Sequence, residues 1–267
     1  MKRIIVAALA VVALALPLAQ AAPVQASAFS GVFFVNCKFS NTKQVDPIVA
    51  PGSPLSSHLH TFMGNTGITE NTTADNIKLS GTTCADKLDI SGYWQPSLIA
   101  PDGSVVLPAD MNAYYRKNNG DVGTFIAFPA GLKALSGGFS YNCGTGTPFT
   151  TTPYDCTPYG PKAYLRLGTR FASCWDGVNL DSADHKSHLA FPKRGICPAT
   201  HPVQLPRLTF HIRYPSVIDP TLYTLSSGAL STLHGDFFNG WDQDRLQHLV
   251  DACLNASVAC GRAEKVA

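Results

Sequence analysis

The chain contains few charged residues: Asp, Glu, Lys and Arg make up 14% of its 267 residues. There are 20 basic and 18 acidic residues, and two of the basic ones, Lys2 and Arg3, stand at the start. The remainder therefore has 18 residues of each sign. Binding to nucleic acid or to an anionic membrane requires a basic surplus, so this balance argues against both partners.

After the first 21 residues no apolar run approaches the ~20 residues that a membrane-spanning helix needs. The run from Ile4 to Leu18 is shorter, follows Lys2-Arg3 and precedes Ala19-Gln20-Ala21, which has the form of a signal-peptidase site. We therefore predict a signal peptide over residues 1–21 and an extracellular protein with no membrane contact after cleavage. No linker or internal repeat divides residues 22–267, which predicts a single secreted domain.

Several catalytic motifs are missing. The sequence has no G-x-S-x-G nucleophile elbow, no phosphate-binding G-K-[ST] loop and no C-x-x-C pair. Eight cysteines remain, an even number that in an exported chain favours disulfides over a thiolate metal site. Eight cysteines allow on the order of 100 connectivities, so spacing alone leaves the pairing open. The shortest closures give the pairing Cys143–Cys156, Cys253–Cys260, Cys174–Cys197 and Cys37–Cys84.

Frequent Pro, Gly, Ser, Thr and Asn separate short apolar or alternating runs, a pattern typical of β structure. Leu208, Phe210 and Ile212 alternate with polar residues, which predicts a strand with one buried face and His211 on the other. Acidic residues followed by apolar residues at helical spacing predict a helix from Asp242 to Leu254. The predicted strands are Gly31–Phe39, Tyr93–Ile99, Asp121–Phe128, Ala163–Phe171 and Leu208–Tyr214, and the predicted loops are Pro101–Arg116 and Gly144–Pro161.

The predicted fold class is therefore mainly β: a layered, sandwich-like single domain with long loops, disulfides and a C-terminal helix.

Five of the eight histidines fall in three short clusters that also contain small, turn-forming and acidic residues. Imidazole is the commonest metal ligand and exchanges its proton near neutral pH, so such clusters indicate a functional site. The clusters are Ser57-His58-Leu59-His60, the segment from Asp181 to His188 with His185 and His188, and His234-Gly235-Asp236.

One hypothesis is a metal site. In an extended segment His58 and His60 project to the same face, and in a helical turn His185 and His188 do so too. His234 or Asp236 would complete the ligands. A set rich in imidazole suits a divalent transition metal such as zinc, copper or iron better than calcium.

A second hypothesis uses the carboxylates. Asp176, Asp181, Asp184, Asp236 and Asp242 lie in the same blocks as Trp175 and Trp241, and a carboxylate pair beside an aromatic surface is typical of glycosidases. A third, structural interpretation is that these Asp and His residues hold loops together by hydrogen bonding to the backbone, while the tryptophans lie in the core.

The segment FASCWDGVNLDSADHKSHLAFP, residues 171–192, resembles the DUF1996 family, a secreted microbial family whose label denotes a domain of unknown function. Other blocks similar to this family lie before and after this segment, in the family's order. They are Asp46-Pro47-Ile48-Val49, Ser57-His58-Leu59-His60, Tyr93-Trp94-Gln95-Pro96, Phe128-Pro129-Ala130-Gly131-Leu132 and His234-Gly235-Asp236-Phe237-Phe238-Asn239-Gly240-Trp241-Asp242.

Some members of that family carry carbohydrate-binding modules, which implies glycan or cell-wall surroundings. We therefore predict a carbohydrate-active or cell-wall-associated, hydrolase-like protein acting on a polysaccharide or cell-wall glycan. The alternative is a non-catalytic glycan-binding or structural secreted protein. The predicted roles are catalysis for Asp184, Asp236 and His185, substrate binding for Trp175, Asp176 and Trp241, and metal binding for His58, His60, His188 and His234.

Overall fold

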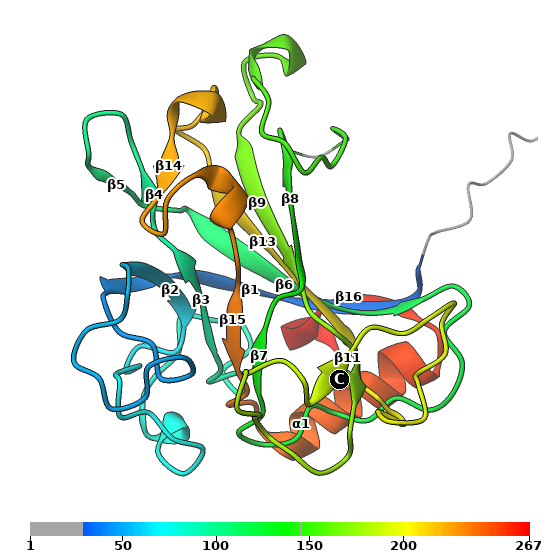
Figure 1. The fold of residues 1–267 in the computed structure, drawn as a ribbon. Helices are drawn as coiled ribbons and strands as arrows, with labels where there is room; N and C mark the ends of the chain where they lie inside the picture. Colours follow the sequence, from blue (N-terminus) through cyan, green and yellow to red (C-terminus); the bar gives the residue numbers. More distant parts are fainter. Residues whose placement is uncertain (1–28, 145) are drawn as a thin grey trace, which may run out of the picture.

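The computed structural model describes residues 29–144 and 146–267, and its main feature is one large curled sheet (Figure 1). Nine strands follow one another across it and a tenth pairs with β1 at the side. Across the sheet they are β7 (Lys133–Leu135), β15 (Asp236–Phe238), β3 (Gly92–Pro96), β2 (His60–Gly64), β1 (Phe29–Lys43), β6 (Asp110–Asn118), β13 (Arg207–Tyr214), β9 (Leu165–Arg170) and β8 (Gly138–Asn142), with β16 (Ala259–Arg262) beside β1.

Two small sheets and several short helices complete the architecture. The small sheets are β11 (Leu189–Ala190), β10 (Cys174–Trp175) and β12 (Val203–Gln204), and β14 (Thr224–Leu225), β4 (Leu98–Ile99) and β5 (Val105–Val106). The 3-10 turns are η1 (Ile77–Leu79), η2 (Thr157–Tyr159), η3 (Pro220–Leu222), η4 (Leu230–Thr232) and η6 (Ala263–Lys265). The mainly β class is thus confirmed.

The two edge strands of the large sheet, β7 and β8, are consecutive in the chain and are joined by Ser136 and Gly137. Between them, the Ser136 amide donates to the Gly235 carbonyl at 2.8 Å and the Gly137 amide to the Arg170 carbonyl at 2.9 Å. Across the interior, the rings of Tyr93 on β3 and Phe210 on β13 lie 5.2 Å apart. Opposite walls of one sheet therefore face each other across the apolar core, which gives the layered packing.

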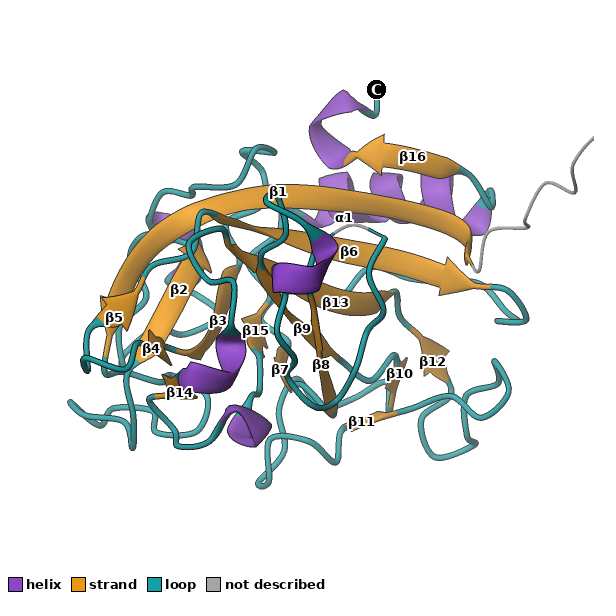
Figure 2. Ribbon diagram, turned by 90° about the horizontal axis from the view of Figure 1, so that it is seen from above, coloured by secondary structure: helices purple, strands orange, loops and turns teal. Residues whose placement is uncertain are grey.

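Four of the five predicted strands are confirmed, within β1, β3 with β4, β9 and β13. The alternation on β13 holds, because Leu208, Phe210 and Ile212 are fully buried in the core. His211 faces the other way, as predicted. The long strand β1 bends across the top of the sheet in Figure 2 and joins β2 to β6.

Two predictions about the chain path were wrong. Residues 121–128 form no strand: the Ile126 amide donates to the Gln204 carbonyl on β12, but the amides on either side of it donate to side chains, Phe125 to Asn255 and Ala127 to Gln247. Residues 101–116 are not a loop, since β5 and most of β6 lie there. In β6 the polar outward residues mask the alternation of buried Met111, Ala113 and Tyr115.

The predicted C-terminal helix is confirmed as α1 (Gln243–Leu249), which continues as one π-helical stretch, η5 (Val250–Asn255). The Asp242 side chain caps it by accepting from the Arg245 amide at 3.0 Å. Its apolar face, including Leu246 and Leu249, is buried.

All four disulfides form with the pairing that the shortest closures suggested: Cys37–Cys84, Cys143–Cys156, Cys174–Cys197 and Cys253–Cys260. Such a set fits an oxidising, extracellular setting. Among the described residues no helix is long and apolar enough to cross a bilayer. The predicted signal peptide, residues 1–21, lies outside the described residues.

Candidate functional site

The sheet brings two of the three histidine clusters together on its outward face. His60 is the first residue of β2 and Asp236 the first of β15, and β3 lies between these strands, with Trp94 paired to Asp236 (Figure 1). His58 and His234 each precede one of these residues by two positions. Although 176 positions apart in sequence, their Nε2 atoms lie 3.2 Å from each other.

Backbone hydrogen bonds at Nδ1 leave Nε2 of His60 and His234 as the ring nitrogen that can bind a ligand. His60 Nδ1 lies 3.0 Å from the Val45 carbonyl oxygen and His234 Nδ1 2.9 Å from that of Thr232. A carbonyl only accepts, so in the neutral ring Nδ1 carries the proton and Nε2 a free lone pair. His58 Nδ1 lies 2.8 Å from Ser57 Oγ. Backbone partners of this kind also fix metal-binding imidazoles.

Two buried carboxylates adjoin these imidazoles. Asp236 is fully buried, its Oδ2 lies 3.9 Å from His234 Nε2, and neither oxygen has a hydrogen-bond partner among the described residues. Asp46 Oδ2 lies 4.0 Å from His60 Nε2, while its Oδ1 accepts from the amides of Ile48 and Val49. His60 Nε2 is also buried without a partner there. Buried polar atoms rarely stay unpaired, so this group of atoms suits a ligand.

Burial and mutual repulsion keep the three rings neutral. Burial, and then the neighbouring His234, lowers the pKa of His58 to about 4. Burial and His58 lower the pKa of His60 to about 3, and burial also lowers the pKa of His234. Metals bind neutral imidazole, so the rings are in the ligand form at neutral pH.

The geometry fits a metal ion. The ligand atoms of His58, His60 and His234 all lie within 4.8 Å of one another. Two nitrogens bound tetrahedrally to zinc at ~2.0–2.1 Å are about 3.3 Å apart, close to the 3.2 Å between His58 and His234. Asp236 or Asp46 would supply an oxygen ligand.

The second cluster borders this site instead of joining it. His188 is buried, with its nitrogens 2.9 Å from Ser182 Oγ and 2.7 Å from the Lys133 carbonyl oxygen. His185 Nδ1 lies 2.9 Å from Asp181 Oδ1. The loop nevertheless reaches the site electrostatically: the charge of His185 acts on Asp46, and that of Lys186 on His234 and Asp236.

Asp184 is exposed and organises the turn of this loop. Its Oδ1 accepts from the amide of Ser187 and the hydroxyl of Ser182, and these bonds lower its pKa. The roles predicted for Asp184, His185 and His188 remain predictions, and the hydrogen bonds that these side chains make hold the loop.

The predicted substrate-binding residues are Trp241 in the core and Trp175 and Asp176 at the small sheet that contains β10. Trp241 is fully buried and donates from Nε1 to the Tyr115 hydroxyl at 2.9 Å. Trp175 lies on β10 and donates to the Asn179 carbonyl at 2.6 Å. Asp176 accepts from the amides of Val178 and Asn179. Their binding roles stay predictions, and the structure gives each of them a structural contact.

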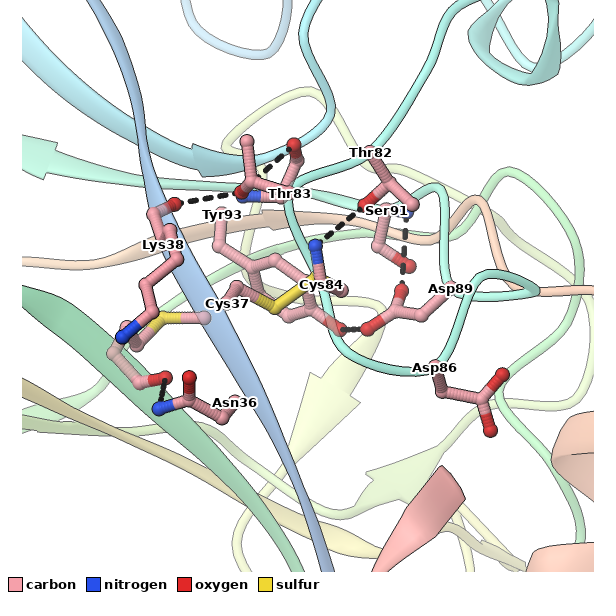
Figure 3. Close-up of a disulfide and its surroundings, with 12 residues drawn as sticks. Asn36, Cys37, Lys38, Thr82, Thr83, Cys84, Asp86, Asp89, Ser91 and Tyr93 are labelled. Atoms are coloured by element: carbon pink, nitrogen blue, oxygen red, sulfur yellow. Dashed lines mark hydrogen bonds between the residues drawn. A yellow bond between two sulfur atoms is a disulfide. The ribbon is translucent and has the colours of Figure 1, made fainter.

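A further group of potential ligands, Cys37, Cys84 and Asp89, is closed to metal (Figure 3). The two sulfurs are joined in a disulfide and cannot bind as thiolates. Asp89 accepts from the Tyr93 hydroxyl at 2.7 Å and from the Ser91 amide at 3.1 Å.

The sequence analysis missed two residues of the site, Asp46 and Trp94. Trp94 is buried on β3 beside Asp236, and its Nε1 has no hydrogen-bond partner among the described residues. Both residues stand in blocks that carry the family resemblance. Proximity to His58 and His60 in such a block was the signal available for Asp46.

Comparison with known protein families shows which family the chain resembles. The family described as Domain of unknown function (DUF1996) matches residues 46–241, a span that includes His58, His60, His234, Asp46 and Asp236. No curated protein and no solved structure matches the chain. Because the match covers well over half of its length, the chain belongs to the DUF1996 family.

Proposed function

We propose that this protein is a secreted metalloprotein that holds one divalent transition-metal ion at the Nε2 atoms of His58, His60 and His234, with Asp236 as the oxygen ligand. One observation carries the proposal. Three imidazoles, two of them oriented by backbone carbonyls, offer ring nitrogens within 4.8 Å of one another beside a fully buried carboxylate that has no partner among the described residues.

The ligand types favour zinc, copper or iron. Imidazole nitrogens suit these metals, whereas calcium and magnesium prefer sites made wholly of oxygen. Three histidines with one carboxylate or water match the tetrahedral coordination of zinc. The four disulfides agree with secretion, where transition metals are bound without competition from cytosolic thiols.

The activity we propose is hydrolysis of a cell-wall polysaccharide. A metal ion at this site would supply Lewis acidity and a hydroxide nucleophile near neutral pH. His58 and His234 are half-buried, so the outer side of the site is open to a substrate. Asp46 is placed to exchange a proton there, because burial raises its pKa and only one of its oxygens is occupied by backbone amides. The substrate class follows from the family's glycan-associated members.

One observation favours a non-catalytic role. The acids and histidines of the 181–188 loop all make hydrogen bonds that hold the loop, as in a protein that binds a glycan without cleaving it.

Metal content tests the proposal directly. The mature protein is loaded with zinc, copper or iron, dialysed and analysed for metal, beside His60→Ala and the control His248→Ala, which removes an exposed histidine on α1. We expect one ion per chain in the wild type and in His248→Ala, and none in His60→Ala. Equal metal content in all three would refute the site.

The loaded protein is then screened against cell-wall polysaccharides for binding and for product release. Release that disappears in His60→Ala supports hydrolysis. Binding without release, unchanged in His60→Ala, supports the non-catalytic role.

A further inference from the structure

A second candidate site lies on the outward face of the sheet, over β6, β13, β9 and β8, away from the strands that hold the histidines. It is a hollow of about 410 Å³, within the usual range for small-ligand pockets. The strand register places Arg170 beside both Thr209 and Gly138. The hollow is lined by Arg116, Arg170, Thr209, His211, Ser140 and Phe149, among others.

Arginine side chains concentrate positive charge there. Burial and the charges of Arg207 and Arg166 lower the pKa of Arg116 to about 10, and burial and Arg170 lower the pKa of Arg207. The guanidinium groups of Arg166 and Arg207 thus repel that of Arg116, and the guanidinium group of Arg170 repels that of Arg207. The carboxylate of Asp121 acts on Arg207 in the opposite direction. Two arginines and no acid are among the described residues that line the hollow, so its charge is positive, which favours an anion.

The floor and the rim are shaped to admit a ligand. His211 lines the hollow, and its Nδ1 is buried without a hydrogen-bond partner among the described residues. A Cβ at Gly168 would lie 2.6 Å from Ser140 Oγ, so glycine keeps the floor deep. At the rim, Phe149 is 51% exposed, with its ring 5.2 Å from that of His211 and 5.5 Å from the Arg166 guanidinium.

We propose that this hollow binds an anionic sugar residue of a polysaccharide, with its carboxylate or sulfate between Arg116 and Arg170 and its ring against Phe149. Arginine forms paired hydrogen bonds with planar oxyanions. An exposed aromatic ring offers a flat apolar surface to the ring of a sugar. The hydroxyls of Ser140 and Thr151 suit sugar hydroxyls, while that of Thr209 accepts a hydrogen bond from Arg116. The proposal does not depend on the metal site.

Calorimetric titration tests it with three probes: trigalacturonate, a sulfated disaccharide and a neutral trisaccharide. The variants are Arg170→Gln and Phe149→Ala, both at exposed side chains, and the control is Arg262→Gln, whose side chain is 63% exposed next to Glu264. Thermal unfolding of each variant verifies that it is folded.

We expect at least one of the two anionic probes to bind, and the neutral trisaccharide to bind at least tenfold more weakly. Added salt should weaken the binding. Arg170→Gln should weaken it by roughly 10- to 100-fold, as expected for the loss of charge-assisted hydrogen bonds. Phe149→Ala should weaken it by roughly three- to tenfold, and Arg262→Gln by less than twofold.

Three results would overturn the proposal. They are no binding of either anionic probe at millimolar concentration, equal binding of the neutral trisaccharide, and equal losses in Arg170→Gln and Arg262→Gln. Equally tight binding of a short single-stranded oligonucleotide would reject the sugar as the ligand. Because His60→Ala should leave this binding unchanged, failure here is distinguishable from failure of the metal site.

Discussion

Two groups of buried polar side chains lie on opposite faces of β3. They differ in whether their polar atoms have hydrogen-bond partners. On the inner face, Tyr93 donates to Asp89, and every oxygen of that carboxylate has a partner. On the outer face, next to Trp94, both oxygens of Asp236 lack one among the described residues. Polar atoms without hydrogen-bond partners, more than burial or residue type, therefore distinguish a binding site from a structural network.

Burial alone does not separate the two acids. Both are fully buried, and burial is the main cause that raises the pKa of Asp89 to about 7 and the pKa of Asp236 well above its usual value. The same contrast holds between histidines: His188 uses both ring nitrogens, whereas Nε2 of His60 is unpaired among the described residues.

Of the changes considered, metal removal should have the largest effect on the stability of the protein. A ligand at a thousand times its Kd stabilises a protein by about 4 kcal/mol, which for a domain of this size corresponds to roughly 8–16 °C in Tm. We therefore expect a chelator to lower the Tm of the metal-loaded wild type by about 10 °C. Differential scanning calorimetry measures it. His60→Ala is the control and should respond by less than 1–2 °C, roughly the scatter of such scans. A chelator response of the same size in that variant would contradict the site.

Asp89 provides the next largest effect, through pH. Its pKa is about 7 in the folded chain and 3.8 when unperturbed, so the unfolded state releases the proton first as pH rises. The unfolding free energy should therefore fall between about pH 4 and pH 7, by on the order of 3–4 kcal/mol from this group, and level off above.

Asp89→Asn removes that contribution while retaining an oxygen for the Ser91 amide. Denaturant unfolding of chelated protein at several pH values should thus show a flatter profile in Asp89→Asn than in the wild type. Parallel profiles would mean that Asp89 does not titrate in this range.

Asp236→Asn should stabilise the metal-free protein and destabilise the metal-loaded protein. Without metal, the replacement removes a buried ionisable group that has no partner, so the variant should be about 1 kcal/mol more stable than the wild type. With metal, the variant loses a ligand and should be the less stable protein. Urea unfolding with and without zinc measures both differences. A destabilising effect of equal size in both conditions would show that Asp236 is a structural residue.

Much of the fold was predictable from sequence because local patterns determine it. The alternation in Leu208–Tyr214, the Asp242 cap and the cysteine spacing are each contained in a few neighbouring residues. The segment 121–128 was predicted wrongly because the Phe125 and Ala127 amides donate to the side chains of Asn255 and Gln247, more than a hundred residues later, which leaves an isolated bridge to Gln204 in place of a strand. No local pattern carries that information.

The sequence indicated the histidines of the candidate site, but not which of the three clusters come together in it. His58, His60 and His234 stand in obvious clusters, but their convergence depends on β2, β3 and β15 lying side by side. The separation of His185 and His188 from this group is set by a loop whose hydrogen bonds are local, and residue type alone could not reveal it.

X-ray absorption at the zinc edge of the loaded protein observes the ligands of the metal themselves. We expect a four-coordinate ion with three imidazole nitrogens and one oxygen at ~2.0–2.1 Å, and loss of one imidazole in His58→Ala. A shell of six oxygens, or an imidazole count that His58→Ala leaves unchanged, would contradict this expectation.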